Sequence, residues 1–420
     1  MKIVRIIARL NVGGPARHVI WLTKALQGEK FQSVLVTGTV PDGEEDMSYF
    51  AYENGITPMV IPEMSRELSI RDLVSFIKIY KILLREKPDI IHTHTAKAGT
   101  LGRLAGFFYK WLNWKVFIGK SRQVKLIHTY HGHIFHSYYS RLKTKFFLLI
   151  EKTLAFFATD KIVVISEKQF EEIHEKFGVG RRSQFVVIPL GIDFLPFLDV
   201  KKDGKEFRRE IRVRDDEILV GIVGRLTEIK NHKFFLRVAK LCHEKNRKVK
   251  FVIIGDGHLR AELERLANKL GINDAVVFAG NRKDISFYGG LDIVALTSLN
   301  EGTPLSLIEA MASGIPVIST MVGGVVDLLG KELNYLDGFI ICERGLGVQI
   351  DTETIESHAN SHTNERRFCN GLIYLIENKD LRQQLTERAR DFVLSVYSKE
   401  RLTKDLINLY ENLLFKNSNL

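Results

Sequence analysis

Two glutamates flank a turn that leads into a helix in the stretch SLNEGTPLSLIEAMASG, residues 298–314. Glu301 comes just before the turn and Glu309 follows it, with seven residues between them. Backbone N–H groups at a helix start bind anions such as phosphate. A carboxylate one turn into the helix can accept hydrogen bonds from a diol. The pattern therefore favours a ligand with phosphate and hydroxyl groups, while the alternative is two solvated acids that only stabilise the helix dipole.

Two cations follow an apolar run in the segment EILVGIVGRLTEIKN, residues 217–231. Arg225 offers a planar fork of donors and Lys230 a mobile point charge, and both suit a diphosphate. The alternative is an ordinary pair of surface cations. A metal-bridged diphosphate needs hard oxygen ligands, but the chain has no Asp-x-Asp sequence. We therefore expect no metal and no other cofactor.

A pair of glycines, Gly13 and Gly14, ends the first apolar run in NVGGPARHV. Glycines at a strand-to-helix turn let the backbone approach a ligand closely. The full GxGxxG fingerprint is absent, and no acidic residue closes the second apolar run, QSVLVTG. A nicotinamide-binding fold is therefore disfavoured, and a plain turn remains the alternative.

Histidines follow two further apolar runs, at HTHTAKAG and HGHIFH. His94 in the first segment and His131 in the second could face a ligand cleft. His133 and His136 lie close enough to His131 to suggest a metal site, but no carboxylate or cysteine accompanies them in the segment. Zinc is therefore not favoured, and purely structural histidines are the alternative.

Short apolar runs alternate with amphipathic segments along the whole chain, which predicts parallel sheets with crossover helices. The pattern occurs twice, so we expect an α/β protein made of two doubly wound, Rossmann-like domains facing a cleft. The join lies near VVIPLGIDFLPFLDV, where prolines cluster before a charged segment, so we predict domains at 1–190 and 191–397. Ligands of such sheets bind beyond the carboxyl ends of the strands, where the candidate residues lie.

The excess of basic over acidic residues lies in the first part of this 420-residue chain, whose net charge is +11. Residues 1–190 hold 28 Lys+Arg and 17 Asp+Glu, and residues 101–150 hold nine basic residues and no acidic one. Basic residues mixed with aromatics suit an anionic membrane surface. A solvated basic face over a core of aromatics is the alternative, and nucleic acid is a weaker option because no binding motif accompanies the charge.

The cysteines and the N-terminus favour the cytoplasm. Three widely spaced cysteines give neither a disulfide framework nor metal-ligand spacing. The first apolar run is too short for a secretory signal, and no run of about 18 apolar residues predicts a membrane-spanning helix. We therefore expect a cytoplasmic protein that associates peripherally with the inner face of the membrane.

Taken together, these segments resemble the retaining glycosyltransferases of family 4, which have the GT-B fold. The matching pieces include GGPARHV, HTHTAKAGTLGRLAG, VGRLTEIKN, IIGDGHLRAELE, FAGNRKDI and EGTPLSLIEAMASGIPVIST, in the family's order. The resemblance implies that residues 398–420 form a helix packing back on the first domain. The segments HTHTAKAG and HGHIF are most similar to enzymes of surface polysaccharide or O-antigen synthesis on a polyprenyl-diphosphate carrier.

The resemblance also implies roles for individual residues. It implies a catalytic set of His131, Arg225, Lys230 and Glu301. It implies a donor-binding set of Gly13, Gly14, Gly280, Arg282, Gly302, Thr303, Pro304, Leu305 and Glu309. For the acceptor, we expect contacts from Arg17, His94 and Lys97.

Three departures from the family pattern stand out. Asn231 replaces a common glycine after Lys230, Thr303-Pro304 replaces a bulky aromatic, and Asp327 stands where glutamate is usual. The region 331–365 is longer than in a minimal member of the family, and we assign no role to it.

The function implied is metal-independent transfer of a hexosyl or N-acetylhexosaminyl group. We expect a nucleotide-sugar donor, with a UDP-sugar favoured, and a lipid-linked or other oligosaccharide acceptor. The alternatives are a nucleotide-sugar epimerase of the same fold and a non-enzymatic basic membrane-surface protein.

Overall fold

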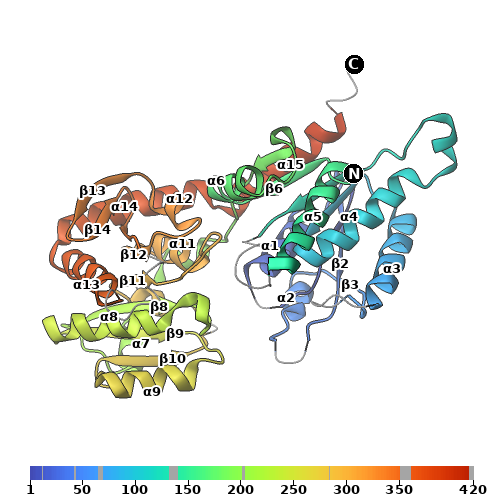
Figure 1. Ribbon diagram of the computed structural model, residues 1–420. Coiled ribbons are helices and arrows are strands. Elements are labelled where there is room, and N and C mark those ends of the chain that lie inside the picture. Colours follow the sequence, from blue (N-terminus) through green and yellow to red (C-terminus); the bar gives the residue numbers. More distant parts are fainter. Residues whose placement is uncertain are drawn as a thin grey trace. The chain divides into compact units, whose positions relative to one another are not determined.

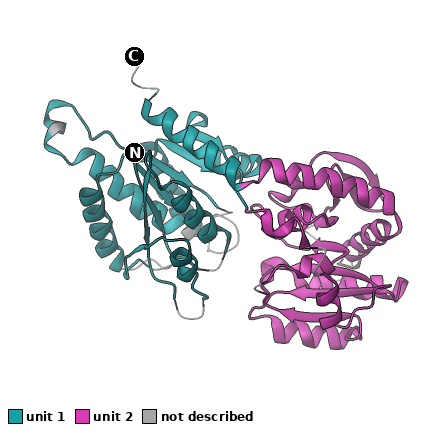
Figure 2. Cartoon of the chain, turned by 180° about the vertical axis from the view of Figure 1, so that it is seen from behind, with its two compact units in different colours: residues 1–192, 399–420 teal, residues 193–398 magenta. Residues whose placement is uncertain are grey.

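The computed structural model describes residues 1–11, 13–41, 44–64, 70–131, 141–200, 204–282, 284–350 and 361–415 (Figure 1). The chain divides into two compact units (Figure 2). Unit 1 comprises Met1–Ile192 with Lys399–Leu420, and unit 2 comprises Asp193–Ser398. Among the residues that the structure describes, no helix has both the length and the apolar character that a membrane crossing requires.

Within the described residues, unit 1 contains a seven-stranded sheet in which all paired strands are parallel. The strand order is β3-β2-β1-β4-β5-β6-β7. The bounds are β1 (Lys2–Ile7), β2 (Gln32–Thr37), β3 (Met59–Val60), β4 (Ile90–His94), β5 (Lys125–Thr129), β6 (Lys161–Val164) and β7 (Phe185–Val187). Strand β1 is buried on both faces, as expected for a parallel sheet whose two faces are covered by helices.

Alternate residues of β1 enter different cores. Val4 and Ile6 pack in a cluster with residues of α3 (Arg71–Glu86) and α4 (Ala96–Trp111). Ile3 packs on the other face, with residues of α1 (Gly14–Ala25). The remaining helices of unit 1 include α2 (Ser48–Glu53), α5 (Arg141–Phe157) and α6 (Glu167–Phe170).

Glycines let α4 lie directly on the sheet. Side chains at Gly99, Gly102 and Gly106 would collide with His128, Thr93 and Leu126, respectively. The three glycines recur at helical spacing, so they form one face of α4. This close packing fixes the first turn of α4 against the end of β4.

The last helix, α15 (Lys399–Phe415), belongs to unit 1 although it follows unit 2 in the chain. Its Leu402, Leu406 and Tyr410 are buried in the cluster that contains Ile3. The Tyr410 hydroxyl lies 2.7 Å from His92 Nδ1. Hydrophobic burial and this polar contact together hold α15 on the sheet.

The described part of unit 2 holds an eight-stranded sheet with the order β10-β9-β8-β11-β12-β15-β14-β13. The bounds are β8 (Ile218–Val223), β9 (Val249–Ile254), β10 (Val276–Gly280), β11 (Ile293–Leu296), β12 (Val317–Thr320), β13 (Glu332–Leu336), β14 (Phe339–Cys342) and β15 (Leu346–Val348). Its helices include α7 (Gly204–Glu210), α8 (His232–Lys245), α9 (Arg260–Leu270), α10 (Phe287–Gly290), α11 (Leu305–Ala312), α12 (Val325–Leu329), α13 (Ser361–Glu377) and α14 (Lys379–Val396). The predicted alternation of strands and helices is confirmed in both units.

The hairpin β13–β14 adds antiparallel strands to the edge of this sheet. Its turn is Asp337-Gly338, and both residues have positive φ, 42° and 87°. Such a turn matches the twist of hairpin strands and favours Asp-Gly. This hairpin accounts for part of the region, 331–365, to which the sequence analysis gave no role; residues 351–360 lie outside the described residues.

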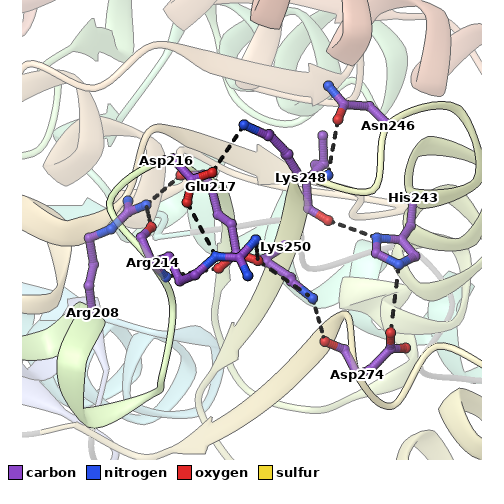
Figure 3. Close-up of polar contacts among 10 residues, drawn as sticks. Arg208, Arg214, Asp216, Glu217, His243, Asn246, Lys248, Lys250 and Asp274 are labelled. Atoms are coloured by element: carbon purple, nitrogen blue, oxygen red, sulfur yellow. Dashed lines mark hydrogen bonds and ion pairs between the residues drawn. The ribbon is translucent and has the colours of Figure 1, made fainter.

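Charged side chains at the amino ends of β8 and β9 pair with one another (Figure 3). Lys248 Nζ lies 3.0 Å from an Asp216 oxygen. Lys250 Nζ donates to the Asp274 carbonyl at 2.7 Å. Because these strands are parallel, their carboxyl ends lie together at the opposite end of the strands. The candidate residues are at these carboxyl ends.

Candidate functional site

The carboxyl ends of β8 and β11 form the topological switch point of unit 2. Strands β8 and β11 are neighbours, while the chain runs from β8 outward to β9 and β10 on one side and from β11 to β12 on the other. In open parallel sheets, ligands bind at this point because the two following loops diverge and leave space between them. The sequence-predicted residues Arg225, Lys230, Glu301 and Glu309 all follow these two strands.

The loop after β8 ends in the turn η6 (Glu228–Lys230), and Asn231 is the N-cap of α8. Arg225 is exposed. Asn231 has φ 51° and ψ 46°, the left-handed region that glycine or asparagine tolerates best. This conformation explains why asparagine stands where the family often has glycine: both residues allow the turn that aims Lys230.

Backbone contacts tie the loop after β11 to this turn. The Leu299 N–H donates to the Ile229 carbonyl at 2.8 Å. The Thr297 hydroxyl donates to the Lys230 carbonyl at 3.1 Å. The two loops therefore position their side chains as one unit, even though about 70 residues separate them in the chain.

Lys230 and Glu301 form an ion pair, with Lys230 Nζ 2.5 Å from Glu301 Oε1. The Ser298 hydroxyl donates to the same carboxylate oxygen at 2.5 Å. Both charged side chains are largely shielded, with exposed fractions of 21% for Lys230 and 11% for Glu301. The predicted neighbours thus lie in contact, and the lysine offsets the carboxylate charge.

Helix α11 starts at Leu305, with Pro304 as its N-cap at φ −75° and ψ 111°. Pro304 therefore precedes the first helical residue instead of occupying it, because its ψ is extended. The loop before it is packed tightly: a side chain at Gly324 would collide with the Gly302 carbonyl. The Gly324 N–H also donates to the Glu301 carbonyl at 3.1 Å.

Thr303 lies buried at the start of α11, and its hydroxyl has no hydrogen-bond partner among the described residues. An unpaired buried hydroxyl costs about 1–3 kcal/mol. The first N–H groups of a helix also lack intrahelical partners. This region of α11 therefore offers donors in excess of what the protein itself satisfies, as an anion site would.

Glu309 is half-buried in α11, and the Tyr288 hydroxyl donates to its Oε2 at 2.8 Å. Tyr288 belongs to the short helix α10 and is itself fully buried. The sequence analysis missed Tyr288. No motif marks it, and only the fold brings it to Glu309, 21 residues away.

Gly280 and Arg282, predicted near a base, lie at the end of β10. Gly280 has φ 68° and follows a register shift in the β10–β9 pairing, so glycine suits this position. Arg282 is held by Glu210, with its Nη2 2.9 Å from Glu210 Oε2. The pKa of Arg282 is raised, chiefly by its hydrogen bond to Glu210. Burial lowers this pKa, and the charge of Asp284 raises it again. This guanidinium is engaged within the protein, in contrast to the exposed Arg225.

In unit 1, the predicted residues gather at the corresponding edge, where β1 and β4 form the switch point. Gly13 is the N-cap of α1 and Gly14 its first residue. Arg17 is exposed on the same helix. Lys97 differs from the prediction: its Nζ lies 2.7 Å from Asp72 Oδ1, and its side chain is only 8% exposed. It ties α4 to α3, because a buried lysine needs a counter-charge.

His94 and His131 are hydrogen-bonded to each other, with His94 Nδ1 2.9 Å from His131 Nε2. Burial lowers the pKa of His131 to about 4, and burial also lowers that of His94 well below its ordinary value. Both imidazoles are therefore neutral at pH 7. His18 of α1 stacks edge-on against His131, and the sequence analysis missed it. His133 and His136 lie outside the described residues.

Comparison with known proteins identifies the chain. The model of "Glycosyltransferase Family 4" matches residues 12–194, and that of "Glycosyl transferases group 1" matches residues 203–344. The chain is a glycosyltransferase with a family 4 domain followed by a group 1 domain. The UDP-Gal:alpha-D-GlcNAc-diphosphoundecaprenol alpha-1,3-galactosyltransferase of Escherichia coli is 29% identical over 339 residues, covering 77% of this chain and 82% of that protein.

Other relatives of this glycosyltransferase agree with the assignment. The capsular polysaccharide biosynthesis glycosyltransferase CapM of Staphylococcus aureus is 28% identical over 377 residues, which cover 86% of this chain and 87% of CapM. Among solved structures, Anabaena HepE in complex with UDP has a TM-score of 0.76 at 18% identity, over 98% of this chain and 100% of HepE. The structure of WaaG, a glycosyltransferase of lipopolysaccharide biosynthesis, gives 0.63 at 16% identity, over 98% and 99%. These likenesses confirm the predicted GT-B fold.

Proposed function

We propose that this glycosyltransferase transfers a sugar, with retention of configuration, from a UDP-sugar to a sugar acceptor carried on a polyprenyl diphosphate, in the synthesis of a cell-surface polysaccharide. The observation that carries the proposal is the grouping of Lys230, Glu301 and Glu309 around the start of α11. The name of the E. coli relative states a UDP-Gal donor and a diphosphoundecaprenol-linked acceptor. It supports the same donor and acceptor classes here.

The start of α11 is our candidate for the diphosphate. The first N–H groups of the helix and the unpaired Thr303 hydroxyl supply donors. Lys230 supplies positive charge beside them, and exposed Arg225 supplies more. An anion at the start of α11 would gain hydrogen bonds without any movement of the strands of the sheet.

The two glutamates would bind hydroxyl groups on either side of that diphosphate. In the free protein Lys230 neutralises Glu301. A bound diphosphate would compete for the lysine, so Glu301 could then accept hydrogen bonds from the donor sugar. Glu309 is oriented by Tyr288, and we assign the ribose diol to it.

In the transfer step, the bond between the anomeric carbon and the leaving diphosphate oxygen breaks. The acceptor oxygen bonds to that carbon on the same face, and the acceptor proton passes to the leaving phosphate oxygen. Arg225 and Lys230 stabilise the departing negative charge, a contribution worth about 10²–10³ in rate per donor in comparable sites. We propose that these cations suffice and that transfer needs no metal.

A surface of unit 1 is our candidate for docking on an anionic membrane. Large apolar side chains are exposed over eight residues, 111–118, which begin with the last residue of α4. They are Trp111 at 43%, Leu112 at 57%, Trp114 at 71%, Val116 at 38%, Phe117 at 94% and Ile118 at 61%. Contiguous exposed apolar patches of this kind mark interaction sites, and tryptophans favour the bilayer interface.

We call these six residues the apolar surface. The charge around the apolar surface favours anionic lipid as its partner. Lys120 is exposed two residues after Ile118, and no acidic residue occurs in residues 101–150. Each basic residue near an anionic bilayer contributes about 1 kcal/mol. A lipid-linked acceptor would then meet unit 1 at the membrane where it resides.

Vesicle flotation tests this docking. Vesicles of phosphatidylglycerol and phosphatidylcholine should carry the protein, and binding should fall steeply with salt. Phe117→Ser and Trp114→Ser should each weaken binding several-fold. Ile70→Ser is the matched control, because Ile70 is equally exposed in unit 1, at 93%, but belongs to a different segment, just before α3. Equal binding to neutral vesicles, or salt-independent self-association without vesicles, would overturn the docking proposal.

Thermal unfolding with a panel of nucleotides and nucleotide sugars tests the donor class. A ligand present at 100 times its Kd stabilises the folded protein by about 2.7 kcal/mol. UDP and UDP-sugars should raise Tm, whereas GDP-sugars and ADP-sugars should not. Stabilisation by another nucleotide series, with none by UDP, would contradict the proposed donor.

A further inference from the structure

Three histidines from separate elements of unit 1 converge at the carboxyl edge of its sheet. His18 comes from α1, His94 ends β4 and His131 follows β5. Each offers one ring nitrogen, and the three nitrogens lie within 4.8 Å of one another. Among the residues that the structure describes, this is the group whose ligand atoms lie close enough to share an ion.

The ring spacing fits coordination to a single metal ion. The ring centroids are separated by 6.0 Å for His18 and His94, 4.9 Å for His18 and His131, and 5.2 Å for His94 and His131. Three imidazoles bound tetrahedrally to Zn²⁺ at about 2.0–2.1 Å place their centroids roughly 5 Å apart. Small ring movements therefore suffice to complete the geometry.

The polar atoms of the group are incompletely satisfied. His18 Nδ1, His94 Nε2 and His131 Nδ1 are buried without a hydrogen-bond partner in the described structure. The contact between His94 Nδ1 and His131 Nε2, at 2.9 Å, is the one hydrogen bond recorded between these rings. A shared metal would replace the proton between those two nitrogens and give His18 a partner as well.

The surroundings select the kind of ion. Among the described residues, no carboxylate joins the three histidines within the distance that a shared ion requires. Mg²⁺ and Ca²⁺ need oxygen ligands, whereas neutral imidazole suits Zn²⁺ and similar transition metals. Three imidazoles also leave one tetrahedral position open.

We propose that His18, His94 and His131 bind one Zn²⁺-class transition-metal ion through three imidazole nitrogens. The ion would link the start of α1 to the ends of β4 and β5. The inference concerns unit 1 alone and does not depend on the proposed sugar transfer, for which we propose no metal requirement.

Cobalt substitution tests the site directly. Full-length protein stripped with chelator is titrated with Co²⁺, and the visible d–d absorption is followed. We expect one equivalent of tetrahedral Co²⁺, displaced by Zn²⁺ and not by Mg²⁺. Zn²⁺ should also raise Tm. Absence of this absorption at stoichiometric Co²⁺ would overturn the proposal.

Variants locate the ion. His94→Gln and His131→Gln should each lower Co²⁺ affinity at least tenfold, while His258→Gln, which removes an exposed histidine of unit 2 that pairs with Glu228, should leave it unchanged. Circular dichroism without metal checks folding, and partly exposed His131 is the safer of the two substitutions. Unchanged affinity in His131→Gln, or loss in His258→Gln, would place the ion elsewhere and refute the assignment.

Discussion

The switch point of unit 2 is lined by charge, whereas that of unit 1 is lined by neutral imidazoles. Lys230 and Glu301 form an ion pair in unit 2. In unit 1, burial and neighbouring positive groups lower the pKa of His18 and His94 well below its ordinary value. Two sheets of the same doubly wound kind therefore present different chemistry at equivalent edges. The charged edge suits an anionic nucleotide, and the neutral edge suits sugar hydroxyls or a borderline-soft metal.

Replacing Lys230 should have the largest effect and would break this comparison most clearly. Lys230→Ala removes the cation beside the diphosphate and the ion pair with Glu301, whose carboxylate keeps its hydrogen bond from Ser298. We expect kcat for sugar transfer to fall about 10²–10³-fold, with little change in Tm. Lys233→Ala is the control, since Lys233 is 45% exposed and pairs with Glu262. Transfer at the wild-type rate in Lys230→Ala would remove the lysine from the site.

Replacing Glu309 should mainly affect nucleotide affinity. Hydrogen bonds to charged groups contribute about 1.5–3 kcal/mol, so Glu309→Ala should weaken UDP binding about 10–100-fold in calorimetry. Glu264→Ala, which removes a carboxylate that pairs with Arg260, should bind UDP normally.

A histidine variant of unit 1 provides a comparison for the same measurement of UDP binding. His131→Gln should change the Kd for UDP by less than about threefold, because we assign the nucleotide to unit 2. A threefold change in Kd corresponds to less than about 1 kcal/mol of binding free energy. If His131→Gln weakened UDP binding as much as Glu309→Ala, the division of roles between the units would be wrong.

Acid should destabilise the protein through His232, two residues after Lys230. Burial, and then the charge of Lys230, lower the pKa of His232 to about 4. The unfolded state therefore binds more protons between about pH 6.5 and pH 4, so stability falls as pH drops through that window. Relative to pH 7, His232 should cost about 2 kcal/mol at pH 5.

Denaturant unfolding at the two pH values measures this cost. His232→Leu should reduce the difference in unfolding free energy between pH 7 and pH 5, whereas His258→Gln, at an exposed position, should leave it unaltered. An identical pH dependence in His232→Leu and the wild type would rule out this source of acid sensitivity.

The smallest expected effect concerns the turn that aims Lys230. Asn231 is left-handed at φ 51°, so Asn231→Ala should lower the unfolding free energy by about 1 kcal/mol, because alanine is strained there. Asn231→Gly should retain full stability and activity. A destabilised glycine variant would mean that the asparagine side chain, not its backbone, matters.

The sequence was sufficient to predict the fold class and to bring Lys230 and Glu301 together. Both follow apolar runs that pattern as parallel strands, and the carboxyl ends of such strands share an edge. These features depend on local patterns, which a single sequence carries.

Contacts between distant segments could not be predicted in the same way. Tyr288 reaches Glu309 from a short helix without a motif. Asp72 binds Lys97 across two helices, and His18 meets His94 and His131 although far apart in the chain. The Asp337-Gly338 hairpin could have been predicted, because Asp-Gly between apolar runs is a recognisable turn signal. The sequence analysis did not use that signal.

The central claim is tested most directly by following labelled sugar from UDP-sugars to a synthetic sugar-diphosphate-polyprenol acceptor, with chelator in excess. We predict that label enters the lipid only when acceptor is present, that the product keeps the anomeric configuration of the donor, and that Lys230→Ala lowers the rate of transfer about 10²–10³-fold. Isomerisation of the donor without acceptor, or the absence of any transfer to a lipid-linked sugar, would contradict the account.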